Sequence, residues 1–285
     1  MDDLWYSEYH APTVRFSIKV NSQLCHEKSE YQTISVFDSA EFGRFLTLDG
    51  IMMLTERDEF IYHEMITHPA LAVNPEIKNV LVIGAGDGGV ARELSKYKHI
   101  QQIDVVEIDE RVVEVCKEYL PKTACGFDDP RVKLYFQDGL KFVRRKENAY
   151  DLIIVDSTDP FGPGEVLFTK EFYGSCFNAL TERGILVNQH ESSFYKGDAK
   201  EMQAAHRCNA QIFPVSRLYQ AHIPTYPSGH WLFGFSSKGL DPLKDLQADG
   251  WNARGIETNY YNTPLHLGAF ALPNYIKELL ADENS

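Results

Sequence analysis

Residues 84–89 read Gly84-Ala85-Gly86-Asp87-Gly88-Gly89 and directly follow the apolar run 80–83. A glycine-rich turn between a buried strand and a helix lets the backbone approach a nucleoside closely. Glu107 ends the next apolar run, about 20 residues further on, where an acid can accept the two ribose hydroxyls. The glycine pattern alone is weak, but the turn and the acid together favour a nucleoside site.

Outward from this turn, apolar runs alternate with amphipathic segments. The predicted strands are 80–83, 103–108, 132–136, 152–155 and 185–188, and the predicted helices between them are 89–97, 110–119, 140–145 and 170–180. Such alternation predicts a parallel sheet covered by helices on both faces. With the strand order 3-2-1-4-5, the first and fourth strands would flank the ligand crevice. Later strands are predicted at 217–221 and 231–236.

Residues before about 55 have a different pattern. Apolar and polar residues alternate at 14–20, 33–37 and 44–48, which predicts half-buried antiparallel strands. Asp49-Gly50 predicts a tight hairpin turn with positive φ. Thr55 and the acids after it predict the start of a helix running from about Glu56 to Ala72. We therefore expect a β-strand domain at 1–55 and an α/β domain at 56–285.

Composition narrows the class of protein. The 285 residues carry 28 Lys and Arg against 41 Asp and Glu, a net charge of −13, which argues against nucleic acid and anionic membrane surfaces as partners. Five scattered cysteines without a C-x-x-C pair argue against a disulfide framework or a zinc site. No apolar run reaches membrane-spanning length, and the acidic, aromatic start is unlike a secretory signal, so we expect a cytoplasmic protein.

Acidic residues gather at the predicted carboxyl ends of the strands. Asp138 ends the third strand and Asp156 the fourth, and with Asp87 and Asp159 they would face one crevice. Several carboxylates with too few cysteines or histidines for a metal need another cation, and a polyamine would serve. Tyr226 and Trp231 could line a slot for such an aliphatic cation, and Tyr62, His63 and Gln32 are not decisive by themselves.

Nearly the whole chain resembles the polyamine aminopropyltransferase family, whose type member is spermidine synthase. The matching motifs are Trp5-Tyr6, Glu30-Tyr31-Gln32, Leu48-Asp49-Gly50, 58–65, 84–89, 128–132, Asp156-Ser157-Thr158-Asp159-Pro160, Gly162-Pro163 and 223–229. The resemblance implies a doubly wound, mostly parallel sheet of the class I methyltransferase-like Rossmann type, with a small N-terminal antiparallel β domain. It also implies transfer of an aminopropyl group from decarboxylated S-adenosylmethionine to putrescine, giving spermidine and 5′-methylthioadenosine.

Site residues follow by position from the resemblance. The donor, or its methylthioadenosine portion, would be held by Gln32, Asp87, Glu107, Asp138, Gly139 and Pro163. The amine channel would be lined by Tyr62, His63, Asp87, Asp156, Ser157, Thr158, Asp159, Tyr226 and Trp231, with Asp156 as the catalytic proton acceptor. Residues from Asp156 to about Glu165 resemble the family's gatekeeping loop, and His190 is a further candidate contact for the amine.

The reaction follows from charge. A sulfonium makes the adjacent carbon electrophilic, so no metal or cofactor is expected, and decarboxylated S-adenosylmethionine is a co-substrate. Expected partners are therefore a small diamine and a sulfonium nucleoside, with a homo-oligomer formed through the N-terminal strands. Three alternatives are disfavoured: an N-methyltransferase by Asp87, a nicotinamide dehydrogenase by Asp138 and Asp156, and a non-catalytic polyamine-binding protein by Asp156 with Tyr226. The acceptor stays open among putrescine, cadaverine, agmatine and longer polyamines.

Overall fold

The computed structural model describes residues 4–157 and 167–281. Its strands are β1 (Trp5–Ala11), β2 (Val14–Lys19), β3 (Ser22–Lys28), β4 (Thr33–Ser39), β5 (Gly43–Leu48), β6 (Ile51–Thr55), β7 (Asn79–Gly84), β8 (Gln102–Glu107), β9 (Val132–Phe136), β10 (Tyr150–Asp156), β11 (Leu180–Gln189), β12 (Val215–Ala221) and β13 (Trp231–Ser237). Its α-helices are α1 (Glu59–Val73), α2 (Gly89–Ser95), α3 (Glu110–Tyr119), α4 (Pro121–Ala124), α5 (Gly139–Val143), α6 (Lys170–Ala179), α7 (Lys196–Ile212), α8 (Ala248–Asn252), α9 (Thr263–Ala269) and α10 (Asn274–Ala281).

The central sheet has seven strands in the order β12-β13-β11-β10-β7-β8-β9. From β9 to β11 the neighbouring strands are parallel, and β13 runs antiparallel to both β11 and β12. In chain order the parallel strands read 3-2-1-4-5, so the predicted order is confirmed. The topological switch falls between β7 and β10, which places the ligand crevice beyond their carboxyl ends.

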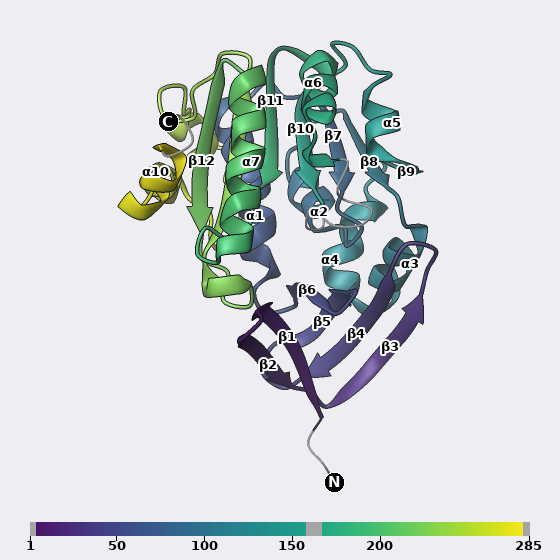
Figure 1. Cartoon of the computed structure of the whole chain (residues 1–285). Helices are drawn as coiled ribbons and strands as arrows, with labels where there is room; N and C mark the ends of the chain where they lie inside the picture. The colour runs from purple at the N-terminus through teal and green to yellow at the C-terminus, as the bar shows by residue number, and fades with distance from the viewer. Residues whose placement is uncertain (1–3, 158–166, 282–285) are drawn as a thin grey trace.

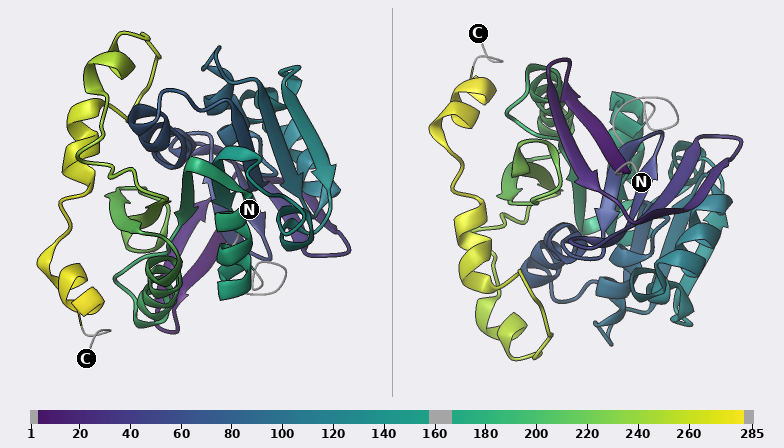
Figure 2. Two further views of the ribbon diagram at one scale, coloured as in Figure 1. Left: turned by 90° about the horizontal axis from the view of Figure 1, so that it is seen from above. Right: turned by 90° about the horizontal axis from the view of Figure 1, so that it is seen from below.

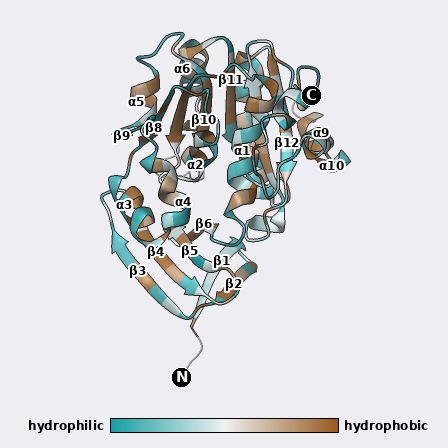
Figure 3. Cartoon of the chain, turned by 180° about the vertical axis from the view of Figure 1, so that it is seen from behind, coloured by the Kyte–Doolittle hydropathy of each residue, from teal (hydrophilic) through white to brown (hydrophobic). Residues whose placement is uncertain are grey.

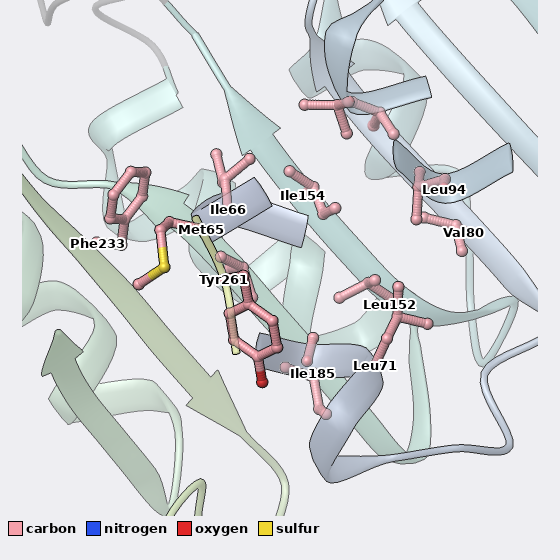
Figure 4. Close-up of a cluster of buried hydrophobic side chains, with 14 of the residues drawn as sticks. Met65, Ile66, Leu71, Val80, Leu94, Leu152, Ile154, Ile185, Phe233 and Tyr261 are labelled. Atoms are coloured by element: carbon pink, nitrogen blue, oxygen red, sulfur yellow. The ribbon is translucent and has the colours of Figure 1, made fainter. Parts of the chain in front are cut away.

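Helices cover the two faces of this sheet (Figure 1). Alternation along each strand divides the core, because Val80 and Val82 pack on one face and Leu81 and Ile83 on the other. Figure 3 shows the central strands as the most apolar part of the ribbon. Figure 4 shows side chains of α1, among them Ile66, packed beside side chains of the sheet such as Ile154. The predicted class, a doubly wound and mostly parallel sheet, is confirmed.

The N-terminal strands form a four-stranded antiparallel sheet, β3-β4-β5-β6, and a separate β1-β2 hairpin. Both lie beyond the carboxyl ends of the parallel strands (Figure 1). Asp49 and Gly50 have φ values of 50° and 83° and join β5 to β6, which confirms the predicted tight turn. One face of the four-stranded sheet packs on α3, where Ile34 and Leu46 join Val112 in a buried cluster.

The expected start of the first helix is wrong. The first helix begins at Glu59 and not at Glu56, because Thr55 still pairs with Phe45 in the sheet and its hydroxyl donates to Asp58 at 2.6 Å. The capping residue of α1 is therefore Asp58. The predicted boundary between 55 and 56 falls at the end of β6 and stays a prediction.

Helices α7 to α10 are absent from the sequence prediction. The last of them belong to a C-terminal segment that runs along the β12 side of the molecule (Figure 2). Across residues 4–157 and 167–281, no helix combines the length and the apolar character that crossing a membrane requires.

Candidate active site

The glycine-rich turn lies against the end of β10. Gly84 has a φ of +84°, and a Cβ there would lie 1.9 Å from the carbonyl oxygen of Asp156. The backbone N–H of Ala85 donates to that same oxygen at 2.9 Å. Only glycine fits so close an approach, so the turn and the end of β10 form one rigid unit.

A cavity of about 520 Å³ opens at this edge of the sheet. Around it lie all the predicted site residues that the structure describes: Gln32, Tyr62, His63, Asp87, Glu107, Asp138, Gly139, Asp156, Ser157, Tyr226 and Trp231. They come from the N-terminal sheet, α1, the strand ends of the parallel sheet and the loop before β13. The structure thus brings together side chains up to about 200 positions apart in the chain.

The part of the cavity over β8 and β9 is suited to a nucleoside. Glu107 is buried, and its Oε1 accepts the backbone N–H of Asp109 at 2.9 Å. Burial raises the pKa of Glu107 to about 7, although backbone N–H donors oppose the shift. Gln32 reaches this region from the N-terminal sheet and donates to Asp109 Oδ2 at 3.0 Å. Asp138 caps α5 by accepting from Lys141 N at 3.0 Å.

Asp156 lines the cavity at the end of β10. The Tyr62 hydroxyl donates to its Oδ1 at 2.6 Å, and its Oδ2 accepts no hydrogen bond from residues 4–157 and 167–281. Burial raises the pKa of Asp156 to about 7, with a further contribution from the charge of Asp87. A carboxyl group with this pKa can exchange a proton near neutral pH.

His63 lies between two carboxylates. Its Nδ1 is 2.5 Å from Glu59 Oε2, and its Nε2 is 3.2 Å from Asp87 Oδ1. Burial alone would lower the pKa of His63, but Asp87 and Glu59 raise it well above 6.5. The resulting imidazolium lowers the pKa of Asp87 against the effect of burial. Asp87 also accepts from the backbone N–H of Gly89, the first residue of α2, at 2.6 Å, so it contacts the start of that helix as well as facing the cavity.

Three potential ligand atoms, one each from His63, Asp87 and Asp156, lie within 4.8 Å of one another. This spacing would also suit a metal ion. Neutral imidazole is the form that binds metals. Both ring nitrogens of His63 face carboxylates that favour the protonated ring, so the arrangement suits an ammonium group better than a metal.

Aromatic rings line the part of the cavity toward β13. The ring of Tyr226 lies 5.8 Å from that of Tyr62 and 4.8 Å from that of Trp231. The Tyr226 hydroxyl donates to Met53 O at 2.5 Å, and Thr225 donates through both N–H and hydroxyl to Asp58 Oδ2. The loop before β13 is thereby fixed to the start of α1.

Several lining residues had no signal in the sequence. They are Glu8 and His10 from β1, Gln189 and Glu191 at the end of β11, and Asp198 on α7. Glu8 is already well paired, because its Oε2 accepts from Tyr6 and from Met52 N. Only the fold places these residues beside α1 and β10.

The expectation that His190 contacts the amine is not supported. Among the described residues, Gln189 and Glu191 line the cavity, while the His190 side chain lies 2.9 Å from Asn188 and beside His206. Alternating residues at a strand end point to opposite sides, which explains the difference. Thr158, Asp159 and Pro163, with the rest of the predicted gatekeeping loop through 165, lie outside the described residues.

Comparisons with known proteins agree along the whole chain. Residues 59–247 match the family model of the spermine/spermidine synthase domain, and residues 4–56 match that of the spermidine synthase tetramerisation domain. The polyamine aminopropyltransferase of Alkaliphilus oremlandii is 66% identical over 99% of both chains, and that of Clostridium beijerinckii is 63% identical over 98% of both.

Solved structures give the same result. A crystal structure of spermidine synthase in complex with the transition state analogue AdoDATO has a TM-score of 0.95 and 41% identity, covering 98% of this chain and 95% of that one. Spermidine synthase from Thermotoga maritima has a TM-score of 0.92 and 39% identity, covering 98% and 94%.

The fold and the comparisons together define a transferase with the architecture of the class I methyltransferases, and acidic side chains line the cavity at the carboxyl ends of its parallel strands. The chain belongs to the spermine/spermidine synthase family, the polyamine aminopropyltransferases.

Proposed function

We propose that this enzyme transfers the aminopropyl group of decarboxylated S-adenosylmethionine to putrescine, giving spermidine and 5′-methylthioadenosine. The observation that carries the proposal is that Asp156 lines the same cavity as Glu107 at the end of β8 and hydrogen-bonds to Tyr62, whose ring lies beside that of Tyr226. A nucleophile bound beside these rings and an electrophile bound beside Glu107 would meet near the Asp156 carboxyl group.

In the proposed reaction the putrescine nitrogen attacks the propyl carbon next to the sulfonium. The carbon–sulfur bond breaks, its electron pair neutralises the sulfur, and the amine proton passes to Asp156. An aliphatic amine has a pKa of about 10, so it arrives protonated and needs a base. Holding nitrogen, carbon and sulfur in line supplies the rest of the rate. Because the sulfonium carries its own leaving group, the proposed reaction needs no metal or other cofactor.

The N-terminal region supports a homo-oligomer as the functional form. Its match to a family model described as a tetramerisation domain is the basis for this proposal. Putrescine and the sulfonium nucleoside are the proposed small-molecule partners.

The test pairs two donors with a panel of amines. The enzyme is incubated with decarboxylated or ordinary S-adenosylmethionine and with putrescine, cadaverine, agmatine or spermidine, and products are identified by mass spectrometry. We expect methylthioadenosine and spermidine from the decarboxylated donor and putrescine. Adenosylhomocysteine with a methylated amine would instead identify an N-methyltransferase, and preference for another amine would overturn the acceptor.

Asp87 should contribute to the choice of donor. A donor carboxylate within about 4 Å of Asp87 would meet a repulsion of up to ~4 kcal/mol at an effective dielectric of 20. His63 at 3.2 Å offsets part of this charge, so the full value is an upper bound. Asp87→Asn should bind the decarboxylated donor more weakly and narrow the gap between the two donors in calorimetry. Equal binding of both donors by the unmodified enzyme would refute the electrostatic account.

A further inference from the structure

A chain of four charged side chains enters the cavity from the side of α2. Arg92 donates to both oxygens of Glu59, from Nη1 to Oε1 at 2.6 Å and from Nη2 to Oε2 at 2.9 Å. Glu59 in turn contacts His63 Nδ1 at 2.5 Å, and His63 Nε2 faces Asp87 at 3.2 Å. Asp87 and His63 line the cavity beside Asp156. The chain of contacts thus connects an arginine outside the cavity lining to the centre of the site.

The His63 ring is buried and closely packed. Its side chain is 2% exposed, and a Cβ on Gly89 would lie 2.3–2.4 Å from three of its ring atoms. The groups facing it are Glu59 and Tyr62 on α1, Asp87 from the turn before α2, and Asp156 from β10. Three of these four are carboxyl groups.

We propose that Glu59 is a positioning residue for aminopropyl transfer: it holds His63 as the cation beside Asp87 and Asp156, so that the base is ionised when the amine arrives. This inference rests on the proposed role of Asp156. Glu59 acts through His63, because its two oxygens are engaged by Arg92 and by the imidazole ring.

The charges set the direction of the effect. Burial and the charge of Asp87 raise the pKa of Asp156, whereas the charge of His63 lowers it. Without a negative charge at Glu59, the pKa of His63 should fall, because Asp87 alone is then left to oppose the effect of burial, and the uncharged ring should gain population at neutral pH. The pKa of Asp156 should then rise, and a smaller fraction of the enzyme would carry an ionised base.

Glu59→Gln tests this with little change in volume, since the amide oxygen can still accept from His63. We expect the acidic limb of the pH profile, where kcat/KM for the amine falls as the pH is lowered, to move to higher pH by about one unit. At a given pH on that limb, activity should therefore be about tenfold lower. Should His63 keep its proton, loss of the Glu59 charge would move the limb down instead. An unchanged or downward-shifted limb therefore overturns the inference.

Glu93→Gln is a matched control. Glu93 is also buried, contacts a histidine of α1 (His68, at 3.0 Å) and contacts Arg92, but it does not line the cavity. We expect this variant to keep the acidic limb of the unmodified enzyme, whatever it loses in stability. A shift equal to that of Glu59→Gln would assign the effect to packing.

Two further variants test the route through His63. His63→Gln should shift the limb as Glu59→Gln does, and the double variant should shift it no further. Additive shifts would contradict action through the imidazole. If Glu59→Gln does not fold, Glu59→Asp keeps the charge and should retain the limb even if turnover falls.

A measurement without substrate separates this inference from the proposed function. Nitrogen NMR of the His63 ring at pH 7.5 should show both nitrogens protonated in the unmodified enzyme and one in Glu59→Gln. A ring that stays charged in the variant overturns the inference, whichever amine proves to be the acceptor. Failure to convert putrescine would overturn only the proposed acceptor.

Discussion

At the scale of single residues, burial raises the pKa of two cavity acids to about 7, but their hydrogen bonds differ. Glu107 accepts backbone N–H groups from its own turn, which fix its orientation. Asp156 accepts from a tyrosine hydroxyl through one oxygen. The first arrangement suits a fixed acceptor for ribose hydroxyls and the second a group that gains and loses a proton.

Asp156→Asn should keep the fold and methylthioadenosine binding but lose turnover. The amide keeps the volume but cannot accept the amine proton, and loss of a general base typically costs ~10²–10⁴-fold in rate. Steady-state kinetics at neutral pH measure the loss. Asp151→Asn, at the other end of β10, is the matched control and should stay active. Activity of Asp156→Asn within about threefold of the unmodified enzyme would remove it as the base.

Methylthioadenosine affinity should depend on pH through Glu107. Ribose hydroxyls donate to the ionised carboxylate, and with a pKa of about 7 that form is lost as the pH falls. Calorimetry should therefore show binding weakened about tenfold from pH 8 to pH 6. Glu107→Gln should bind at least about tenfold more weakly at pH 8, with little further change at pH 6. The same pH dependence in both proteins would argue against ribose recognition by Glu107.

At the scale of helices and strands, the sequence predicted the elements whose buried side is strongly apolar. The parallel strands, their order and the helices α1, α2, α3, α5 and α6 follow from that pattern, whereas the short helix α4 was not predicted. Helix α7 gave no such signal because three of its four buried residues are small or polar, namely Ala199, Ala205 and Asn209, and Met202 is its one large buried apolar side chain. In β1 the burial of a side chain does not follow its polarity, since Trp5 and Tyr9 are exposed while Glu8 is buried. A pattern of apolar and polar residues could not show which face of this strand is buried.

Part of the candidate site could also be predicted from the sequence. Residues at the carboxyl ends of parallel strands could be placed together from topology, and the family resemblance supplied Gln32 and Tyr226. Glu8, His10 and Asp198 could not be placed, because nothing in the local sequence brings β1 or α7 to the cavity. Their position depends on long-range packing alone.

Gly89 at the start of α2 tests how closely α1 and α2 must approach. Gly89→Ala should clash with the His63 ring, which Glu59 and Asp87 hold in place, and destabilise the protein by about 1–3 kcal/mol. Gly174→Ala on α6 is the control, because a Cβ there contacts nothing within 4 Å and should stabilise by about 0.5–1 kcal/mol. Thermal unfolding measures the stability of both variants. A Gly89→Ala variant as stable as the Gly174→Ala variant would show that α1 and α2 can move apart.

At the scale of the whole molecule, the N-terminal strands and the parallel sheet with its helices are two structural units that line one site. The N-terminal strands contribute Glu8, His10 and Gln32 to a cavity whose chemistry lies at the edge of the parallel sheet. The site is therefore complete only when both units are docked. The hairpin β1-β2 also carries apolar residues that face solvent in the single chain, among them Trp5 at 54% and Val14 at 39% exposed.

An exposed tryptophan on this hairpin should matter for assembly. Trp5→Glu adds a charge where the proposed oligomer would bury an apolar ring, so it should shift the protein toward smaller species in sedimentation at micromolar concentration. Leu243→Glu, at a residue 43% exposed after β13, should leave the distribution unchanged. If Trp5→Glu assembles like the unmodified protein, the β1-β2 face is not the contact.

The packing of the N-terminal sheet on α3 also affects how the protein is made. Strands β4 and β5 bury Ile34 and Leu46 against Val112 and Val115, which are synthesised some 70 residues later. At roughly 5–20 residues per second, the ribosome needs about 4–15 s to supply that cover. During this interval the apolar sheet face has no α3 to cover it, and such transiently uncovered apolar surface is prone to aggregation in a chain that is still being made.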